Sequence, residues 1–132
     1  MEKADGVILY LAGPMTGLPN MNAPAFFDAE ERLSKLGFIV LNPARLPKGM
    51  PSGKYMPICL AMLQQSDGIA LLPGWRDSKG ANIEFRFAEY QNIKSLSLDT
   101  ILSFFDNESS RNADGGAHEW MKKKFHLIPE SG

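Results

Sequence analysis

The sequence predicts an α/β fold in which a mainly parallel sheet of four or five strands lies between two layers of helices. Apolar runs typical of buried strands alternate with segments of helical periodicity, and three of these runs end in glycine or proline. Strict alternation requires right-handed crossovers, which place helices on both faces of a parallel sheet. We therefore expect a single-domain, three-layer sandwich of the flavodoxin or Rossmann type.

Each element is predicted from its local pattern. Phe26, Ala29 and Leu33 recur at helical spacing, and Asn22 is the expected N-cap of their helix. Residues 93–105 are ambiguous between a strand followed by a helix and one longer helix. The α/β domain is expected over residues 1–105, followed by a polar tail at 106–132 with one short helix. The other expected elements are strands at 6–13, 38–43 and 68–74 and helices at 57–66 and 80–91.

Composition narrows the classes of function. The chain has 132 residues, 44% hydrophobic and 22% charged, and a net charge of -1, so neither nucleic acid nor a membrane surface is an expected partner. Cys59 is the single cysteine, which excludes an internal disulfide, and its apolar surroundings favour a core position. The sequence contains no signal-peptide pattern and no apolar run of about 20 residues. We expect a cytoplasmic protein.

Loops following the three predicted strands should meet at one edge of the sheet, where ligands bind in such folds. Ser78 is the expected N-cap of the helix that follows the third loop. Glu84 lies about one turn into this helix, and its helical neighbours Gly80, Ala81 and Ala88 are all small. Because helical side chains lean toward the N-terminus, this carboxylate can reach the ligand edge. Spacing alone does not separate that arrangement from a solvated glutamate.

The remaining candidates are weaker when taken alone. Asp67 precedes a strand, where aspartate commonly stabilises a turn. The position of Trp75 in a loop at the ligand edge favours a surface on which a base stacks over simple packing. The GPMTG loop, 13–17, lacks the lysine and spacing of a P-loop, and no dinucleotide fingerprint is present. His118 and His126 have no second ligand at metal spacing, so neither a metal nor a cofactor is expected.

Three segments together resemble the nucleoside 2-deoxyribosyltransferase superfamily, which also contains the 2'-deoxynucleoside 5'-monophosphate N-glycosidases. They are YLAGPMTG at 10–17, SDGIALLPGW at 66–75 and SKGANIEFRFAEY at 78–90, in the expected order and with plausible spacing. The resemblance covers residues 6–92 and is closest to a small branch common in phages and prophages.

The resemblance implies a role for each matching residue. Glu84 matches the nucleophile that attacks C1' of the deoxyribose, Asp67 the acid that protonates or holds the departing base, and Tyr10 the residue that orients the glutamate. Ser78 stands where the monophosphate hydrolases carry serine and the transferases aspartate, which favours a nucleotide substrate. The residues implied to hold the substrate are Gly13, Pro14, Met15, Thr16, Gly17, Gly74, Trp75, Ser78 and Gly80.

The leading hypothesis is cleavage or transfer at the N-glycosidic bond of a 2'-deoxynucleoside or its 5'-monophosphate. Two alternatives remain: a non-catalytic nucleotide-binding module that acts as a sensor or sequestering protein, and a hydrolase of another ribosyl compound such as a dinucleotide cofactor. By resemblance, the protein is expected to form a homodimer or larger homo-oligomer, and in that superfamily a neighbouring subunit often completes the site.

Overall fold

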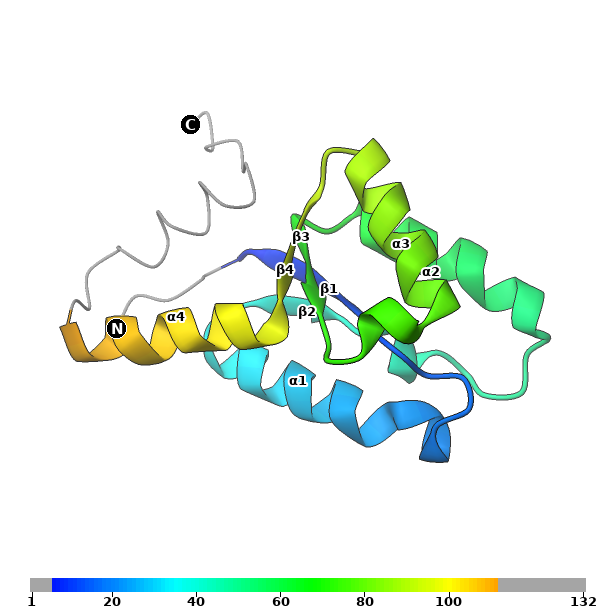
Figure 1. The fold of residues 1–132 in the computed structure, drawn as a ribbon, viewed down its shortest axis with the longest axis horizontal. Coiled ribbons are helices and arrows are strands. Elements are labelled where there is room, and N and C mark those ends of the chain that lie inside the picture. The colour runs from blue at the N-terminus through cyan, green and yellow to red at the C-terminus, as the bar shows by residue number, and fades with distance from the viewer. Residues whose placement is uncertain (1–5, 112–132) are drawn as a thin grey trace.

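The computed structural model describes residues 6–111, with side chains to residue 106, and the predicted alternation of strands and helices is confirmed there. Short 3-10 turns at Pro19–Asn22, Pro43–Arg45, Ser52–Lys54 and Trp75–Asp77 join the main elements (Figure 1). The main elements are β1 Ile8–Ala12, α1 Ala23–Lys35, β2 Ile39–Leu41, α2 Tyr55–Gln64, β3 Gly68–Leu71, α3 Lys79–Tyr90, β4 Lys94–Ser97 and α4 Leu98–Arg111.

All strand pairings in the described sheet are parallel, and the strand order is β2-β1-β3-β4. The central pair, β1 and β3, aligns Tyr10 with Ile69 and Ala12 with Leu71. From β1 the chain moves outward to β2 and then returns to the other side for β3. This reversal puts a topological switch point between β1 and β3, the place where open α/β sheets bind ligands at the carboxyl ends of their strands.

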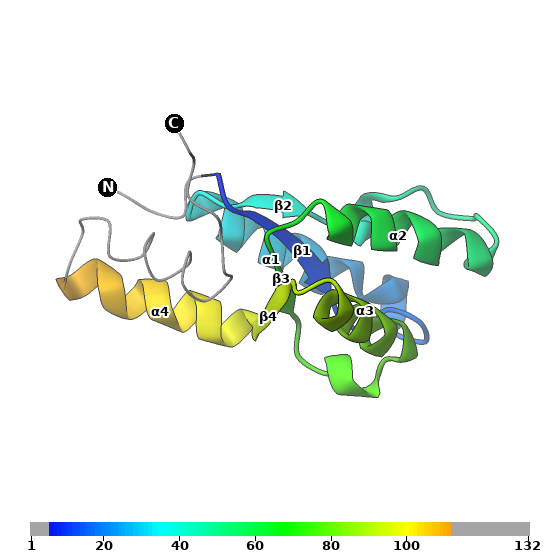
Figure 2. The same ribbon diagram turned by 90° about the horizontal axis from the view of Figure 1, so that it is seen from above.

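The helices form the two outer layers of the predicted three-layer fold. α1 and α4 cover one face of the sheet and α2 and α3 the other (Figures 1 and 2). Alternation along β1 sorts its side chains accordingly, because neighbouring residues of a strand point to opposite faces. Leu9 and Leu11 pack in the core beneath α1 and α4, whereas Tyr10 and Ala12 pack beneath α2 and α3.

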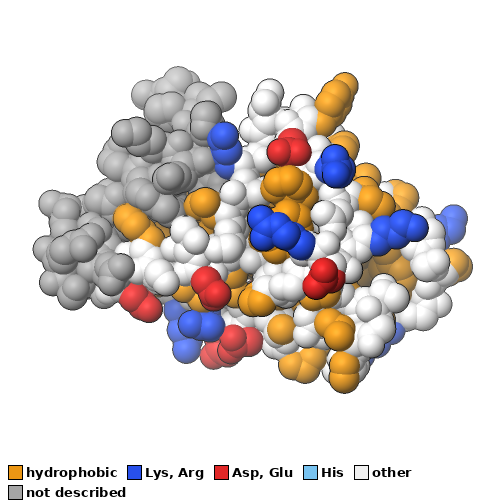
Figure 3. All heavy atoms as spheres, in the orientation of Figure 1, with side chains coloured by type: hydrophobic (Ala, Val, Ile, Leu, Met, Phe, Trp, Pro, Cys, Tyr) orange, Lys and Arg blue, Asp and Glu red, His pale blue; other side chains and the backbone are white. Residues whose placement is uncertain are grey.

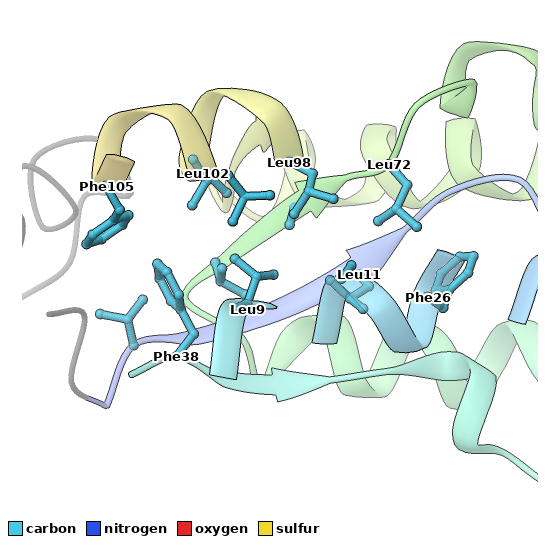
Figure 4. Close-up of a cluster of buried hydrophobic side chains, with 13 residues drawn as sticks. Leu9, Leu11, Phe26, Phe38, Leu72, Leu98, Leu102 and Phe105 are labelled. Atoms are coloured by element: carbon cyan, nitrogen blue, oxygen red, sulfur yellow. The ribbon is translucent and has the colours of Figure 1, made fainter. Parts of the chain in front are cut away.

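The larger of the two cores lies between the sheet and the α1–α4 layer. Figure 4 shows Leu98, Leu102 and Phe105 of α4 on the same side of the sheet as Phe38. The rings of Phe38 and Phe105 meet edge to face with centroids 5.7 Å apart. This packing explains how the ambiguous stretch at 93–105 is resolved into strand and helix: Ile101, Leu102 and Phe105 lie on one helical face and are buried.

Several expectations need correction. α4 continues through Arg111, so the start of the expected polar tail is helical; the remainder, with its expected short helix, lies outside the described residues. β2 was expected to be buried, but it is an edge strand, and Ile39 is 51% exposed. Asn22 precedes α1 without capping it through its side chain, because its amide instead donates to the Pro14 carbonyl (2.9 Å).

Gly13, directly after β1, is required by a close approach of two chain segments. A Cβ at this position would lie 2.8 Å from the Leu72 Cβ. The GPMTG loop therefore leaves the sheet against the segment that follows β3.

Charges of both signs are interspersed with apolar side chains on the face of the molecule drawn in Figure 3. Among the helices of the described residues, none has the length and apolar character that crossing a bilayer requires.

Candidate active site

Glu84 is a buried carboxylate on α3. The helix begins after Ser78, whose Oγ accepts a hydrogen bond from the Ala81 backbone N–H (3.1 Å), so the predicted N-cap is confirmed. Ala81 and Ala88, one turn before and after Glu84, are themselves buried and let α3 approach its neighbours closely. Glu84 is only 7% exposed, so the alternative of a solvated glutamate is wrong.

Tyr10 holds this carboxylate from the centre of the sheet. Its hydroxyl donates to Glu84 Oε2 over 2.7 Å, and the Tyr10 side chain is completely buried. The two residues are 74 positions apart in the sequence, and the layering of α3 on β1 brings them together. The bond fixes one carboxylate oxygen and the orientation of the other.

Burial shapes the acid–base properties of this pair. Loss of solvation raises the pKa of Glu84 from 4.5 to about 7, and the hydrogen bond from Tyr10 partly opposes that rise by favouring the charged form. Burial, followed by the nearby Glu84 charge, raises the pKa of Tyr10 well above its usual value. The Tyr10 hydroxyl consequently keeps its proton and remains a donor.

Cys59 on α2 completes the surroundings of the Tyr10 hydroxyl, with which its thiol is in hydrogen-bonding contact. Burial raises the pKa of the Cys59 thiol. A neutral thiol is a poor nucleophile, so Cys59 is a packing neighbour of the buried pair, in agreement with the core position predicted for it.

Glu84 lines a cavity of about 510 Å³ at the carboxyl-end edge of the sheet. Its walls come from the loop after β1, the segment between β2 and α2, and the first turns of α2 and α3. Six of the predicted site residues line it, namely Gly13, Met15, Thr16, Ser78, Gly80 and Glu84, and Tyr10 lies directly behind Glu84.

Four predicted binding residues are not among those lining the cavity. Pro14 and Gly74 face each other, since a Cβ on Gly74 would lie 3.4 Å from Pro14 Cγ. Gly17 has a positive φ of 85° and open space around it, which fits a turn. The Trp75 indole packs on the Phe85 ring, with centroids 4.8 Å apart, under the Arg76 guanidinium. These packing contacts explain the position of the Trp75 side chain.

Asp67 is not brought to the cavity, although the resemblance implies that it acts on the departing base. It precedes β3 and thus lies at the amino-terminal edge of the parallel sheet, opposite the edge that carries Glu84. Its carboxylate accepts from the Ile8 backbone N–H (2.9 Å), and its own N–H donates to the Ile8 carbonyl (2.7 Å). Asp67 closes the start of the β1–β3 ladder.

The sequence pattern did not identify the residues that line the cavity between the end of β2 and the first turn of α2. Lys48 and Met50 line the cavity from the segment between β2 and α2, which has the proline and glycine content of a loop and no recognisable motif. Tyr55 and Met56 line it from the first turn of α2. Only the expectation that the loop after the second strand reaches the ligand edge pointed to this segment. Among the described residues that line the cavity, Lys48 and Glu84 are the charged ones.

Together these features define a parallel α/β domain with a buried, tyrosine-bound carboxylate in a cavity at its switch point. The chain belongs to the family described as "Domain of unknown function (DUF4406)", whose model matches residues 7–96. The matched range holds Tyr10, Glu84 and every residue that lines the cavity. No curated protein matches the chain.

Proposed function

We propose that this protein cleaves or transfers at the N-glycosidic bond of a 2'-deoxynucleoside 5'-monophosphate or its nucleoside, with Glu84 as the nucleophile. The observation that carries the proposal is the 2.7 Å bond from Tyr10 to a buried carboxylate in the wall of a cavity. The resemblance of the three sequence segments to the nucleoside 2-deoxyribosyltransferase superfamily supports the same assignment.

The first step joins Glu84 to the sugar. One carboxylate oxygen attacks C1' of the deoxyribose, the C1'–N bond breaks, and its electron pair leaves with the base, which takes up a proton. The resulting glycosyl ester is then opened by water, or by a second base in a transfer reaction, which regenerates the carboxylate. A carboxylate fits this task because its ester with C1' can be broken again.

The environment of Glu84 supports a nucleophile that is active in its ionised form. With its pKa near 7, about half of the side chain is ionised at neutral pH, and desolvation makes that carboxylate more reactive than one in water. Because Tyr10 engages Oε2, Oε1 is the oxygen that we assign to the attack. Positive charge developing on the sugar would further favour the ionised form.

A 5'-monophosphate is favoured over a nucleoside by the charges around the cavity. Lys48 is the cationic side chain among the described lining residues, and its ammonium donates to Asn20 Oδ1 (3.3 Å). Ser78 and Gly80 place the N-terminus of α3, where backbone N–H groups favour anions, on the same cavity. A phosphate at the 5' end would have these groups as partners.

A non-catalytic nucleotide-binding module is the second candidate, and the position of Asp67 favours it. The acid implied by the resemblance to protonate the base lies at the opposite edge of the sheet. In the enzymatic proposal the proton must therefore come from a donor other than Asp67. A binding protein would need no such donor.

The test is incubation with a panel of 2'-deoxynucleosides, their 5'-monophosphates and a nicotinamide dinucleotide, with and without an acceptor base, followed by chromatography of free base. We expect release from the deoxyribosyl compounds by the wild type, loss of at least about 100-fold in Glu84→Ala, and no loss in Glu89→Ala, which removes an exposed glutamate from the same helix. Binding of the panel compounds without release would favour the binding module. Equal turnover by wild type and Glu84→Ala would refute the nucleophile.

A further inference from the structure

Methionine is concentrated around the cavity. Of the five methionines in the part of the chain that the structure describes, four line it: Met15, Met21, Met50 and Met56, here called the methionine wall. They come from four separate places, the loop after β1, the turn before α1, the loop before α2 and the first turn of α2. Met62, by contrast, lies farther along α2 and packs against the second core.

Met56 brings the wall next to the nucleophile. Its terminal methyl carbon lies 3.6 Å from the position that a Cβ on Gly80 would occupy. Gly80 precedes Glu84 by one helical turn, on the side toward which the Glu84 side chain leans. A thioether therefore borders the space immediately in front of the carboxylate.

Met21 is held on the cavity by an unusual backbone. Asn20, Met21 and Asn22 all have positive φ, 53°, 54° and 62°, and Met21 is the one of the three whose side chain offers no local hydrogen bond in compensation. The turn is fastened by the bond from Lys48 to Asn20 and by the bond from Asn22 to Pro14. Met21 is nevertheless 49% exposed, so burial does not account for its position.

Two polar groups beside the methionine wall, the Tyr55 hydroxyl and Asn20 Oδ1, already form hydrogen bonds within the protein. The Tyr55 hydroxyl donates to the Pro47 carbonyl (2.6 Å) and accepts from the Met50 N–H (3.2 Å). Asn20 Oδ1 accepts from Lys48. A ring beside Met21 and Met50 would meet polarisable thioethers, because the Tyr55 hydroxyl and Asn20 Oδ1 are already bonded.

We infer that the methionine wall is the surface that receives the flat heteroaromatic ring of the substrate and determines which rings fit. This inference rests on the proposed function, because a base leaving C1' must lie beside the carboxylate that displaces it. Thioether sulfur makes favourable contacts with aromatic rings, and the unbranched methionine side chain adapts its shape to them. The ring is held by van der Waals contact with the polarisable thioether groups.

The experiment uses the full chain labelled with ¹³C at the methionine methyls, in the Glu84→Gln background so that no ligand is consumed. Single Met→Leu variants assign the resonances. The probes are 2'-deoxyadenosine 5'-monophosphate and 2'-deoxycytidine 5'-monophosphate, and 2-deoxyribose 5-phosphate is the control without a base. We expect ring-current shifts of Met15, Met21, Met50 and Met56 with the two nucleotides, smaller shifts with the base-free sugar, and none at Met62.

Binding of the nucleotides should weaken about threefold to tenfold in Met56→Ala and recover in Met56→Leu, which restores apolar volume. The affinity for 2-deoxyribose 5-phosphate, the control without a base, should change in neither variant. Nucleotide binding that leaves all four methyl resonances unmoved would overturn the inference, even if base release by the wild type upheld the proposed function. Shifts of the four methyls without any base release would uphold the methionine wall and refute the enzymatic proposal. Absence of both binding and release would refute both.

Discussion

Replacing Glu84 by glutamine tests the buried carboxylate independently of any activity. Burial raises the pKa of Glu84 from 4.5 to about 7 in the folded chain. The folded state therefore holds the proton more tightly than the unfolded state does. This contribution to stability is fully present below about pH 4.5 and is lost as the pH rises through about 7. Glutamine keeps the shape of the side chain and has no such dependence.

The size of the change in folding stability follows from the shift in the pKa of Glu84. At about 1.4 kcal/mol per pKa unit, moving from 4.5 to about 7 corresponds to a loss of about 3 kcal/mol. With Glu84 only 7% exposed, solvent screens little of this. Urea unfolding followed by circular dichroism should show the stability of Glu84→Gln rising relative to wild type by about 2–3 kcal/mol between about pH 4.5 and pH 8.

The matched control is Glu89→Gln, an exposed glutamate on the same helix. Its stability gives the baseline for replacing a glutamate on α3 by glutamine. A stability difference between Glu84→Gln and wild type that stays constant across the range would contradict the raised pKa, and with it the view that folding desolvates this carboxylate.

Three further predictions concern the neighbours of Glu84. Tyr10→Phe removes the hydrogen bond that lowers the pKa of Glu84, so the midpoint of the rate–pH profile should rise above about 7 and kcat should fall about tenfold. Lys48→Met should raise KM for 5'-monophosphates about tenfold and KM for nucleosides much less, through the lost bond to the turn at Asn20. Lys54→Met is a control outside the cavity lining. Equal effects on both substrate types would contradict a phosphate role. Gly13→Ala places a Cβ 2.8 Å from the Leu72 Cβ. The clash should lower the free energy of unfolding by about 1–3 kcal/mol in urea titrations. An unchanged unfolding midpoint would contradict the close approach.

The fold was predictable because the hydrophobic patterns are strong and local. The apolar run of β1 and the helical spacing of Phe26, Ala29 and Leu33 in α1 each fix an element within a few residues. Residues 93–105 were ambiguous because Ser95 and Ser97 weaken the strand pattern of β4. That ambiguity is resolved only by tertiary packing of α4 on the sheet.

The site was predictable in part. Glu84 and its small neighbours follow from helical spacing, and Ser78 from its capping chemistry, since both depend on local sequence. Asp67 was misplaced because the role implied by the resemblance was carried over, although a residue directly before a parallel strand lies at the amino-terminal edge of the sheet, opposite the ligand edge. Met21 and Lys48 could not be found, because their positions depend on backbone conformation and on a loop path that no local pattern encodes.

The most direct test of the central claim is to trap the sugar on the protein. Rapid acid quenching during incubation with a 2'-deoxynucleoside 5'-monophosphate, followed by peptide mass spectrometry, should reveal one deoxyribosyl phosphate group on the peptide that contains Glu84. Glu84→Gln should show no adduct, and Glu89→Gln should show the same adduct as the wild type. Base release with no adduct on Glu84, or with the adduct on another residue, would contradict the assignment of Glu84 as the nucleophile.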